Sequence, residues 1–305
     1  MKYTFIVNPN SRSGKGAMIW DEIQPELTKR NVDYEFFMTE YTGHASAIVR
    51  ELTKDGQEHY LIALGGDGTV NEVVNGITYL DRCVLGYIPT GSSNDFARGM
   101  HLPQDYMQAL DVILSSSNIR KMDVGLVTRA GRERRFAVST GIGFDAAICH
   151  QVAVSKLKVF LNKIKLGKLS YVFVALNRLF HDQPVQAEVY LDEEPVRKFN
   201  KMYFAAVMNH PYEGGGFYFC PKADVQDGSL DVIVISGIPK LIVLLLLPTA
   251  YKGLHVHFPG VTVLQGKKVR IKTSRSLAVH TDGEPLFLRR EITAKLLPEQ
   301  LSVFV

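Results

Sequence analysis

The chain has 305 residues, of which 46% are hydrophobic and 22% are charged, and its net charge is +4. This composition excludes an intrinsically disordered protein, and so mild a positive charge does not by itself indicate a nucleic-acid partner. Because a single core usually stops growing by roughly 250–300 residues, the length favours two domains. The three cysteines form no CxxC pair, which argues against structural zinc and for a reducing, cytoplasmic environment. The start of the chain shows no signal-peptide pattern.

Up to Met122 the sequence alternates apolar runs with amphipathic stretches. Four nearly continuous apolar runs predict parallel strands at residues 3–7, 34–37, 60–64 and 84–88. Apolar residues at helical spacing predict helices around residues 19–27, 47–52, 70–77 and 103–114, the last one starting at Pro103. This alternation predicts a three-layer α/β domain whose ligands bind at the carboxyl ends of the strands.

Beyond Met122 the apolar runs become β-branched and aromatic, which predicts an antiparallel sheet domain. Strands are expected at residues 136–140, 185–191, 203–208, 230–235, 268–273 and 277–281. Helices are expected at residues 153–164, 169–180 and 240–252, the last one bent or split by Pro248. Residues 241–247 form the most apolar stretch, which is far short of the ~20 residues that span a bilayer. We expect it to be a buried helix wall rather than a membrane-dipping element.

The run Gly65-Gly66-Asp67-Gly68-Thr69 is the most informative motif. It leaves a predicted buried strand and enters a predicted helix, so backbone N–H groups and a helix N-terminus can face a polyphosphate. The run is shorter than the dinucleotide-binding fingerprint and lacks the lysine of a P-loop. A tight turn that needs glycine only for its backbone geometry is the alternative. Asn8 and residues 90–95 follow two other predicted strands at the same sheet edge, which favours a binding site.

The GGDGT run and the Asn-Glu pair after it resemble the catalytic-domain signature of diacylglycerol kinases and related lipid kinases, with NAD kinases and phosphofructokinases as distant relatives. Four further segments match in order: Asn8-Pro9-Asn10-Ser11 with Gly14, residues 89–98, residues 221–232, and Asp282-Gly283-Glu284. The resemblance covers essentially the whole chain and is greatest to soluble bacterial diacylglycerol-kinase-like proteins. It implies an ATP-binding α/β domain at 1–122, to which 292–305 return, and an antiparallel β-sandwich lipid-substrate domain at 123–291.

The resemblance also implies which residues act. Glu284 would be the general base, with Asp67 and Asp95 as catalytic carboxylates that hold Mg²⁺ and Asp123 as an outer carboxylate of the same ion. Ser92 stands where the family usually has threonine and keeps the hydroxyl. The ATP-binding residues would be Asn8, Pro9, Asn10, Ser11, Gly14, Thr39, Gly65, Gly66, Asp67, Gly68, Thr69, Asn71, Glu72, Ser92 and Asn94.

Relatives with a second, structural ion match this chain at Asp224, Asp227 and Ser229. A plain Asp-Gly turn is the alternative there. His255 and His257 are separated by one residue, but without a third ligand nearby in the sequence we do not expect them to bind a metal.

The resemblance implies an ATP-dependent lipid kinase of phospholipid metabolism, which transfers the γ-phosphate to the hydroxyl of diacylglycerol or a similar lipid. A kinase of a soluble acceptor, as in NAD kinases, and a non-catalytic nucleotide-binding module are the alternatives. We expect a cytoplasmic protein with reversible contact at the inner, anionic membrane surface and no nucleic-acid partner; a homodimer stays open. Five lysines would meet the lipid or form a solvated helix face: Lys156, Lys158, Lys163, Lys165 and Lys168.

Overall fold

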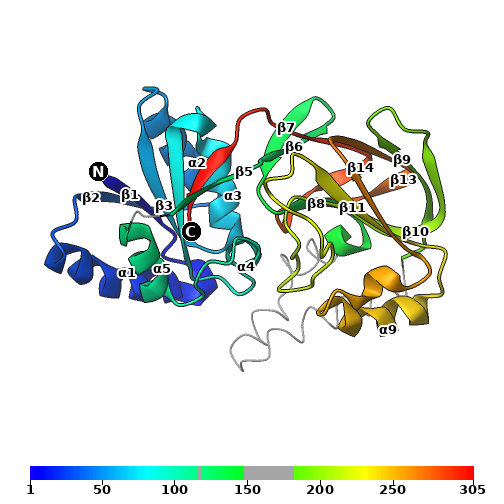
Figure 1. Ribbon diagram of the computed structural model, residues 1–305, viewed down its shortest axis with the longest axis horizontal. Coiled ribbons are helices and arrows are strands. Elements are labelled where there is room, and N and C mark those ends of the chain that lie inside the picture. Colours follow the sequence, from blue (N-terminus) through cyan, green and yellow to red (C-terminus); the bar gives the residue numbers. More distant parts are fainter. Residues whose placement is uncertain (116–117, 148–181) are drawn as a thin grey trace.

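The computed structural model describes residues 1–115, 118–147 and 182–305, which form two sheet-based units side by side (Figure 1). The first unit has a six-stranded sheet in the order β2-β1-β3-β4-β15-β5. Its first four strands are parallel, and β15 runs parallel to β4 but antiparallel to β5. All four strands predicted here are confirmed. Their bounds are β1 Tyr3–Val7, β2 Tyr34–Met38, β3 His59–Gly65, β4 Cys83–Pro89, β5 Ile119–Met122 and β15 Leu301–Phe304.

Helices cover both faces of this sheet and form the predicted three layers. The helices α1 (Ser11–Lys29) and α5 (Tyr106–Ser115) bury Trp20 and Leu110 against one face, together with Phe5 of β1. On the other face, α2 (His44–Thr53) and α3 (Asp67–Gly76) pack over Leu61 and Leu85. Two short helices, η1 (Leu80–Arg82) and α4 (Asp95–Gly99), flank β4.

The predicted helix start at Pro103 is wrong. Asp105 accepts hydrogen bonds from the backbone N–H groups of Met107 and Gln108, at 3.0 and 3.1 Å, and α5 begins at Tyr106. A carboxylate that accepts the free N–H groups of the first turn stabilises the helix at that point. The start is therefore set by the side chain of Asp105, and Pro103 lies in the connection before it.

The second unit is an antiparallel sheet in the order β12-β11-β10-β8-β13-β14-β6-β7. The long strands β10 and β13 each pair with β8 along one part of their length and with β9 along another. The sheet therefore closes around an apolar core that includes Val189, Val232 and Ile271. The bounds are β6 Gly125–Arg129, β7 Arg132–Phe136, β8 Ser139–Gly143, β9 Val185–Leu191, β10 Arg197–Met208, β11 Leu230–Ser236, β12 Val261–Gly266, β13 Lys268–Thr281 and β14 Glu284–Leu296.

Two strand predictions in this unit need correction. Residues 136–140 do not form one strand, because β7 ends at Phe136 and β8 begins at Ser139. Residues 268–273 and 277–281 belong to a single strand, β13, whose pairing with β14 shifts register between Lys272 and Leu277. The irregular register interrupts the apolar pattern, so one strand appeared as two.

The chain crosses between the sheets twice. It first crosses after β5, which ends at Met122, and β6 begins at Gly125 in the second sheet. The return begins after Leu296, not at Ile292 as expected, since Ile292 pairs with Ile271 and is buried in the second core. Only the last segment, ending in β15, reaches the first sheet.

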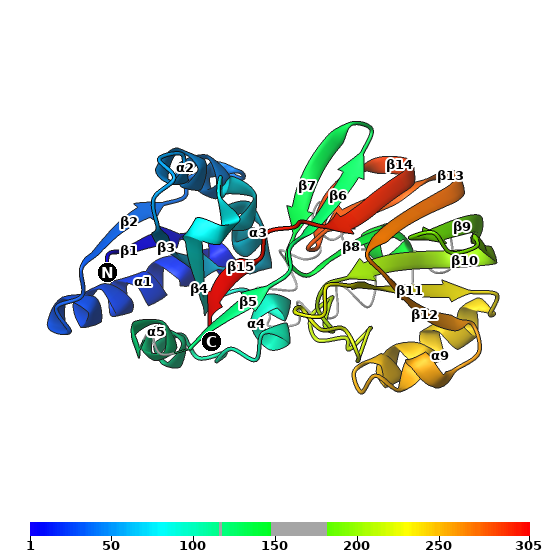
Figure 2. The ribbon, with the colours of Figure 1, turned by 45° about the horizontal axis from the view of Figure 1, so that its top comes forward.

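The helix α9 (Lys240–Ala250) and the short helix η2 (Leu254–His257) lie at the outer edge of the second unit (Figure 2). Pro248 stands inside α9 and does not split it. The expectation of a buried helix wall is only half right, because Val243 is buried while Leu241 and Leu245 are exposed. Among the described residues, none of the helices is long and apolar enough to cross a membrane. The helices expected at 153–164 and 169–180, and the five lysines, lie outside the described residues.

Candidate active site

A cleft of about 620 Å³ is lined by residues of both units. One wall consists of the loops after β1, β2, β3 and β4, as expected for a parallel sheet, and the other consists of second-unit segments near residues 138–139, 213–214 and 282–285. Most of the residues expected to act line this cleft. They are Asn8, Asn10, Ser11, Thr39, Gly66, Asp67, Gly68, Thr69, Glu72, Ser92, Asp95 and Glu284.

Side-chain hydrogen bonds connect the loops of the first wall. Asn8 donates to the hydroxyl of Thr69 at 3.1 Å, and the hydroxyls of Ser11 and Thr90 lie 2.6 Å apart. A Cβ atom on Gly65 would lie 2.2 Å from the Thr69 hydroxyl, so Gly65 permits the tight packing of the glycine loop. These contacts hold the loops of the first wall together.

Several predicted nucleotide-binding residues have structural contacts within the protein. Asn94 does not line the cleft; its side-chain oxygen accepts a hydrogen bond from the Tyr87 hydroxyl at 3.1 Å. Both carboxylate oxygens of Glu72 accept backbone N–H groups near the start of α2, those of Gly43 and Ala45. Pro9 and Gly14 also lie outside the lining of the cleft.

Two carboxylates of the first unit form an acidic pair at the floor of the cleft. Asp67 accepts a hydrogen bond from the backbone of Phe96 at 3.0 Å, next to Asp95. Burial, together with the charge of the neighbouring Asp67, raises the pKa of Asp95 to about 7. Burial likewise raises the pKa of Asp67. One oxygen of Asp95 accepts the Gly215 N–H, and the other is buried, has no hydrogen-bond partner among the described residues and lies 3.9 Å from Nε of Arg98. A buried oxygen beside a second carboxylate fits a divalent cation with oxygen ligands.

Glu284 reaches across the cleft to the glycine loop. A Cβ atom on Gly68 would lie only 2.6 Å from Oε1 of Glu284. The carboxylate of the predicted base therefore lies directly against the loop that was predicted to bind the phosphates. Residues 216 positions apart meet here, and a side chain at position 68 would force the carboxylate of Glu284 to move.

Asp282, to which the sequence assigned no role, fixes the turn that carries Glu284. Its carboxylate accepts hydrogen bonds from the backbone N–H groups of Ala137, Val138 and Ser139, each at 2.9 Å. It also accepts the amide of Asn71 at 2.7 Å. Asn71 is completely buried, and this hydrogen bond joins α3 to the second unit. The Asp-Gly-Glu motif is the sequence signal for this turn. The motif does not reveal that the carboxylate of Asp282 is buried and accepts four hydrogen bonds.

Asp123 contacts the 224–229 loop and not the acidic pair. Its carboxylate accepts the backbone N–H of Gly228 at 3.0 Å and the side-chain amide of Gln300 at 2.9 Å. It is absent from the lining of the cleft. Burial raises the pKa of Asp227, and the carboxylates of Asp224 and Asp123 add to this effect. A cation would relieve this repulsion. However, the two oxygens of Asp227 already accept hydrogen bonds from Ser229 and Gln265, as a plain turn requires.

The magnesium response of the Asp227→Ala variant distinguishes these alternatives. If the loop binds a structural ion, Mg²⁺ without nucleotide raises the melting temperature of the wild type more than that of the variant, because binding adds to the stability of the folded state. Thermal unfolding with and without Mg²⁺ measures both shifts. Equal shifts would mean that Asp227 does not hold the ion.

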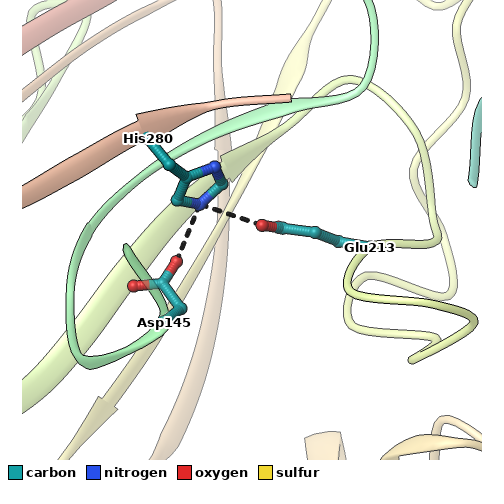
Figure 3. A group of neighbouring side chains, drawn as sticks. All are labelled: Asp145, Glu213 and His280. Atoms are coloured by element: carbon teal, nitrogen blue, oxygen red, sulfur yellow. Dashed lines mark hydrogen bonds and ion pairs between the residues drawn. The ribbon is translucent and has the colours of Figure 1, made fainter. Parts of the chain in front are cut away.

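A second cluster of titratable side chains consists of Asp145, Glu213 and His280 (Figure 3). Nε2 of the completely buried His280 is 3.0 Å from Oδ2 of Asp145 and 2.9 Å from Oε1 of Glu213. The three residues come from three separate segments, so no sequence spacing revealed them. Glu213 lines the cleft, and Gly215 of the same loop binds Asp95. The loop of Glu213 and Gly215 thus connects the acidic pair to His280 on β13, the strand that leads into the turn with Glu284.

Burial disfavours a charged His280, but the two carboxylates outweigh it and hold the pKa of His280 well above its usual value. The Gly283 N–H lies 3.2 Å from Nδ1 and favours an unprotonated nitrogen there. The two carboxylates lie closer to the ring than this N–H does and determine the direction of the shift. The three ligand atoms lie within 4.8 Å of one another, so the cluster could also accept a divalent cation in exchange for the Nε2 proton.

Replacing His280 by Gln should destabilise the protein by about 3–5 kcal/mol, because two buried carboxylates lose their counter-charge. Since the folded pKa is raised, the stabilisation by His280 is complete below pH ~6.5 and is lost as the pH rises through the folded value. The wild type should therefore approach the variant at alkaline pH. Urea unfolding across this range measures the difference. His255→Gln is the control, because His255 is buried without an ion-pair partner; equal losses would contradict the prediction.

Comparisons with known proteins show the family of the chain. Residues 2–127 match the model of the diacylglycerol kinase catalytic domain, and residues 138–305 match that of the YegS C-terminal NAD kinase beta sandwich-like domain. The chain is 30% identical to the "Putative lipid kinase YtlR" of Bacillus subtilis, with 92% of each chain covered. It is 26% identical to the diacylglycerol kinase of Staphylococcus carnosus, with 92% of this chain and 87% of the other covered.

Two solved structures share the fold. The crystal structure titled "a putative diacylglycerol kinase" from Bacillus anthracis has a TM-score of 0.78 and 24% identity, and the match covers 99% of this chain and 94% of that one. An Archaeoglobus fulgidus NAD kinase has a TM-score of 0.54 at 11% identity, covering 100% of this chain and 94% of that one, which supports the NAD kinase-like fold alone. The chain belongs to the diacylglycerol kinase catalytic-domain family, with a YegS-type C-terminal domain.

Proposed function

We propose that the protein transfers the γ-phosphate of ATP to a hydroxyl of diacylglycerol or a related membrane lipid. The observation that carries the proposal is the contact of Glu284 with Gly68, which brings a carboxylate to the glycine loop at the junction of the two units. Phosphoryl transfer needs a phosphate cradle, a cation that offsets charge and a base at the attacking hydroxyl. The cleft offers residues suited to each of these tasks.

In this proposal the two walls divide the work. The loops of Asn8, Thr69 and Ser92 bind the phosphates, and Asp67 with Asp95 would hold Mg²⁺, which neutralises charge on the phosphates when bound. Glu284 takes the proton of the acceptor hydroxyl as the oxygen attacks phosphorus. Asp282 keeps the Glu284 turn rigid, so the base needs little reorganisation. Mg²⁺ as the ion, and a cytoplasmic enzyme that contacts the inner membrane surface, belong to the same proposal.

A kinase of a soluble acceptor is the second candidate, because the NAD kinase of Archaeoglobus fulgidus has the same fold. Transfer of labelled phosphate from ATP to a panel of acceptors tests both candidates. The panel contains diacylglycerol, ceramide, sphingosine, phosphatidylglycerol, undecaprenol and NAD. Labelling of one lipid and not of NAD supports the proposal. Labelling of NAD alone favours the second candidate, and binding of ATP without any labelled product favours a regulatory module.

A further inference from the structure

The helix α9 is apolar on the side that faces the protein and on the side that faces away from it. Val243, Leu246 and Ala250 are buried, and Val243 and Ala250 pack with Phe204 and Ile235 of the sheet. On the opposite side, Leu241, Ile242 and Leu245 are exposed, at the i, i+1 and i+4 spacing of one helix face. An ordinary surface helix has polar residues on the side that faces away from the protein. Packing against the sheet therefore explains the apolar residues on only one side of α9.

The exposed apolar side continues beyond the helix. Tyr251, Leu254 and Phe258 are exposed in the turn and the short helix η2 that follow, and η2 contacts α9. Together with Leu241, Ile242 and Leu245 they form what we call the α9 surface, whose six side chains are 39–64% exposed. Exposed apolar side chains gathered on adjoining elements indicate an interaction site, whereas scattered exposed leucines do not.

The segment of the chain that carries the α9 surface has charges of one sign. Residues 232–281 contain no Asp or Glu and seven Lys and Arg. Lys240 begins α9, and Lys252, which is exposed, follows its end. Lysines at the border of an apolar face place their charges at the level of lipid headgroups while the apolar side chains enter the hydrocarbon boundary. Anionic headgroups complement this charge.

A second copy of this chain and residues 148–181 complement the positive charge at the α9 surface less well than an anionic bilayer does. A symmetric dimer through the α9 surface would place the same lysines of both copies opposite each other. Residues 148–181 of this chain also contain no Asp or Glu, so they offer no complementary charge. A lipid surface supplies both the apolar interior and the negative charge.

We propose that the α9 surface docks the protein onto an anionic lipid bilayer, with the leucines of α9 inserted at the level of the acyl chains. The choice of a bilayer as partner rests in part on the proposed function, in which the acceptor is a membrane lipid. The docking is reversible, because one short helix face buries far less apolar area than a spanning segment.

Co-flotation with vesicles tests the proposal on the full chain. The vesicles contain phosphatidylcholine alone or phosphatidylcholine and phosphatidylglycerol in equal parts. The wild type should bind the anionic vesicles more tightly, and the double variant Leu241→Gln/Leu245→Gln should bind both kinds about tenfold more weakly. Leu288→Gln is the matched control, since Leu288 on β14 is as exposed as Leu245. Lys252→Gln should reduce the preference for anionic vesicles.

A second measurement does not depend on loss of binding. In Leu245→Trp the new indole should shift its emission to shorter wavelength when vesicles are added, against a constant background from the buried Trp20. The Leu288→Trp variant should not respond. An emission that is already short without vesicles, and that vesicles do not change, would mean that protein covers the surface and would overturn the proposal.

Other results also overturn it. Vesicle binding by the double variant equal to that of the wild type excludes the α9 surface as the docking site. If the double substitution instead turns a dimer into a monomer while vesicle binding is unchanged, a second copy occupies the surface. The double variant should phosphorylate a short-chain, water-soluble acceptor as the wild type does. Absence of lipid phosphorylation by the wild type would refute the proposed function but would leave the vesicle results valid.

Discussion

The Glu284→Gln variant should lose roughly 10²-fold or more in turnover while binding ATP almost as tightly as the wild type. Glutamine keeps the shape of the side chain but cannot accept the proton of the attacking hydroxyl. Because the carboxylate lies against Gly68 of the phosphate loop, a small steric change there would disturb nucleotide binding, and the isosteric substitution avoids it. Initial rates on lipid vesicles and calorimetric titration with ATP measure the two effects separately.

Glu40→Gln is the control for this experiment, because Glu40 lines the same cleft from the first unit and has no predicted chemical role. Its rate should stay close to that of the wild type. Full activity of the Glu284→Gln variant would exclude Glu284 as the base. A weakening of ATP binding as large as the loss in rate would assign Glu284 to nucleotide binding instead.

The Asp95→Asn variant should change stability and nucleotide binding in opposite directions. In the wild type the pKa of Asp95 is raised to about 7. Without metal, the folded protein therefore holds a proton on Asp95 that the unfolded chain releases above pH ~3.9. Stability without metal therefore falls as the pH rises through this window. Asparagine removes the ionisation, and the variant should melt on the order of 5 °C higher than the wild type near neutral pH without Mg²⁺.

The same substitution should weaken binding of ATP in the presence of Mg²⁺ by roughly tenfold or more, since a charge-assisted contact is worth about 1.5–3 kcal/mol. Asp67→Ala should likewise weaken magnesium-dependent nucleotide binding. Asp111→Asn, at an exposed position of α5, is the control for both measurements. Unchanged ATP affinity in the Asp95→Asn variant with Mg²⁺ present would remove Asp95 from the ion site.

The sequence predicted the fold and the approximate place of the site because both depend on local patterns. The apolar run before Gly65 predicted β3, and the positions of Asn8, Gly65 and Ser92 after three strands predicted that their loops would meet. The meeting of Glu284 with Gly68 followed from family resemblance alone, since no local pattern relates two residues so far apart.

The features that could not be predicted from the sequence depend on contacts between segments that are far apart in the chain. Asn71 stands beside the glycine motif, but its hydrogen-bond partner Asp282 lies in the distant second unit, and no local pattern indicates that contact. His280 and Glu213 carry no motif and become a cluster only when the second sheet closes. The apolar run of α9 predicted a helix, but hydropathy cannot tell how much of a helix the rest of the protein covers.

The position of β15 restricts the order in which the chain can fold. This strand, formed by residues 301–304, lies between β4 and β5 in the first sheet. As a ribosome releases the N-terminal residues, β4 and β5 have no strand between them, and the gap closes only after the whole second unit has been synthesised. A fragment of residues 1–122 would expose two unpaired strand edges, which are sites of aggregation. The N-terminal unit therefore depends on the last residues of the chain to complete its own sheet.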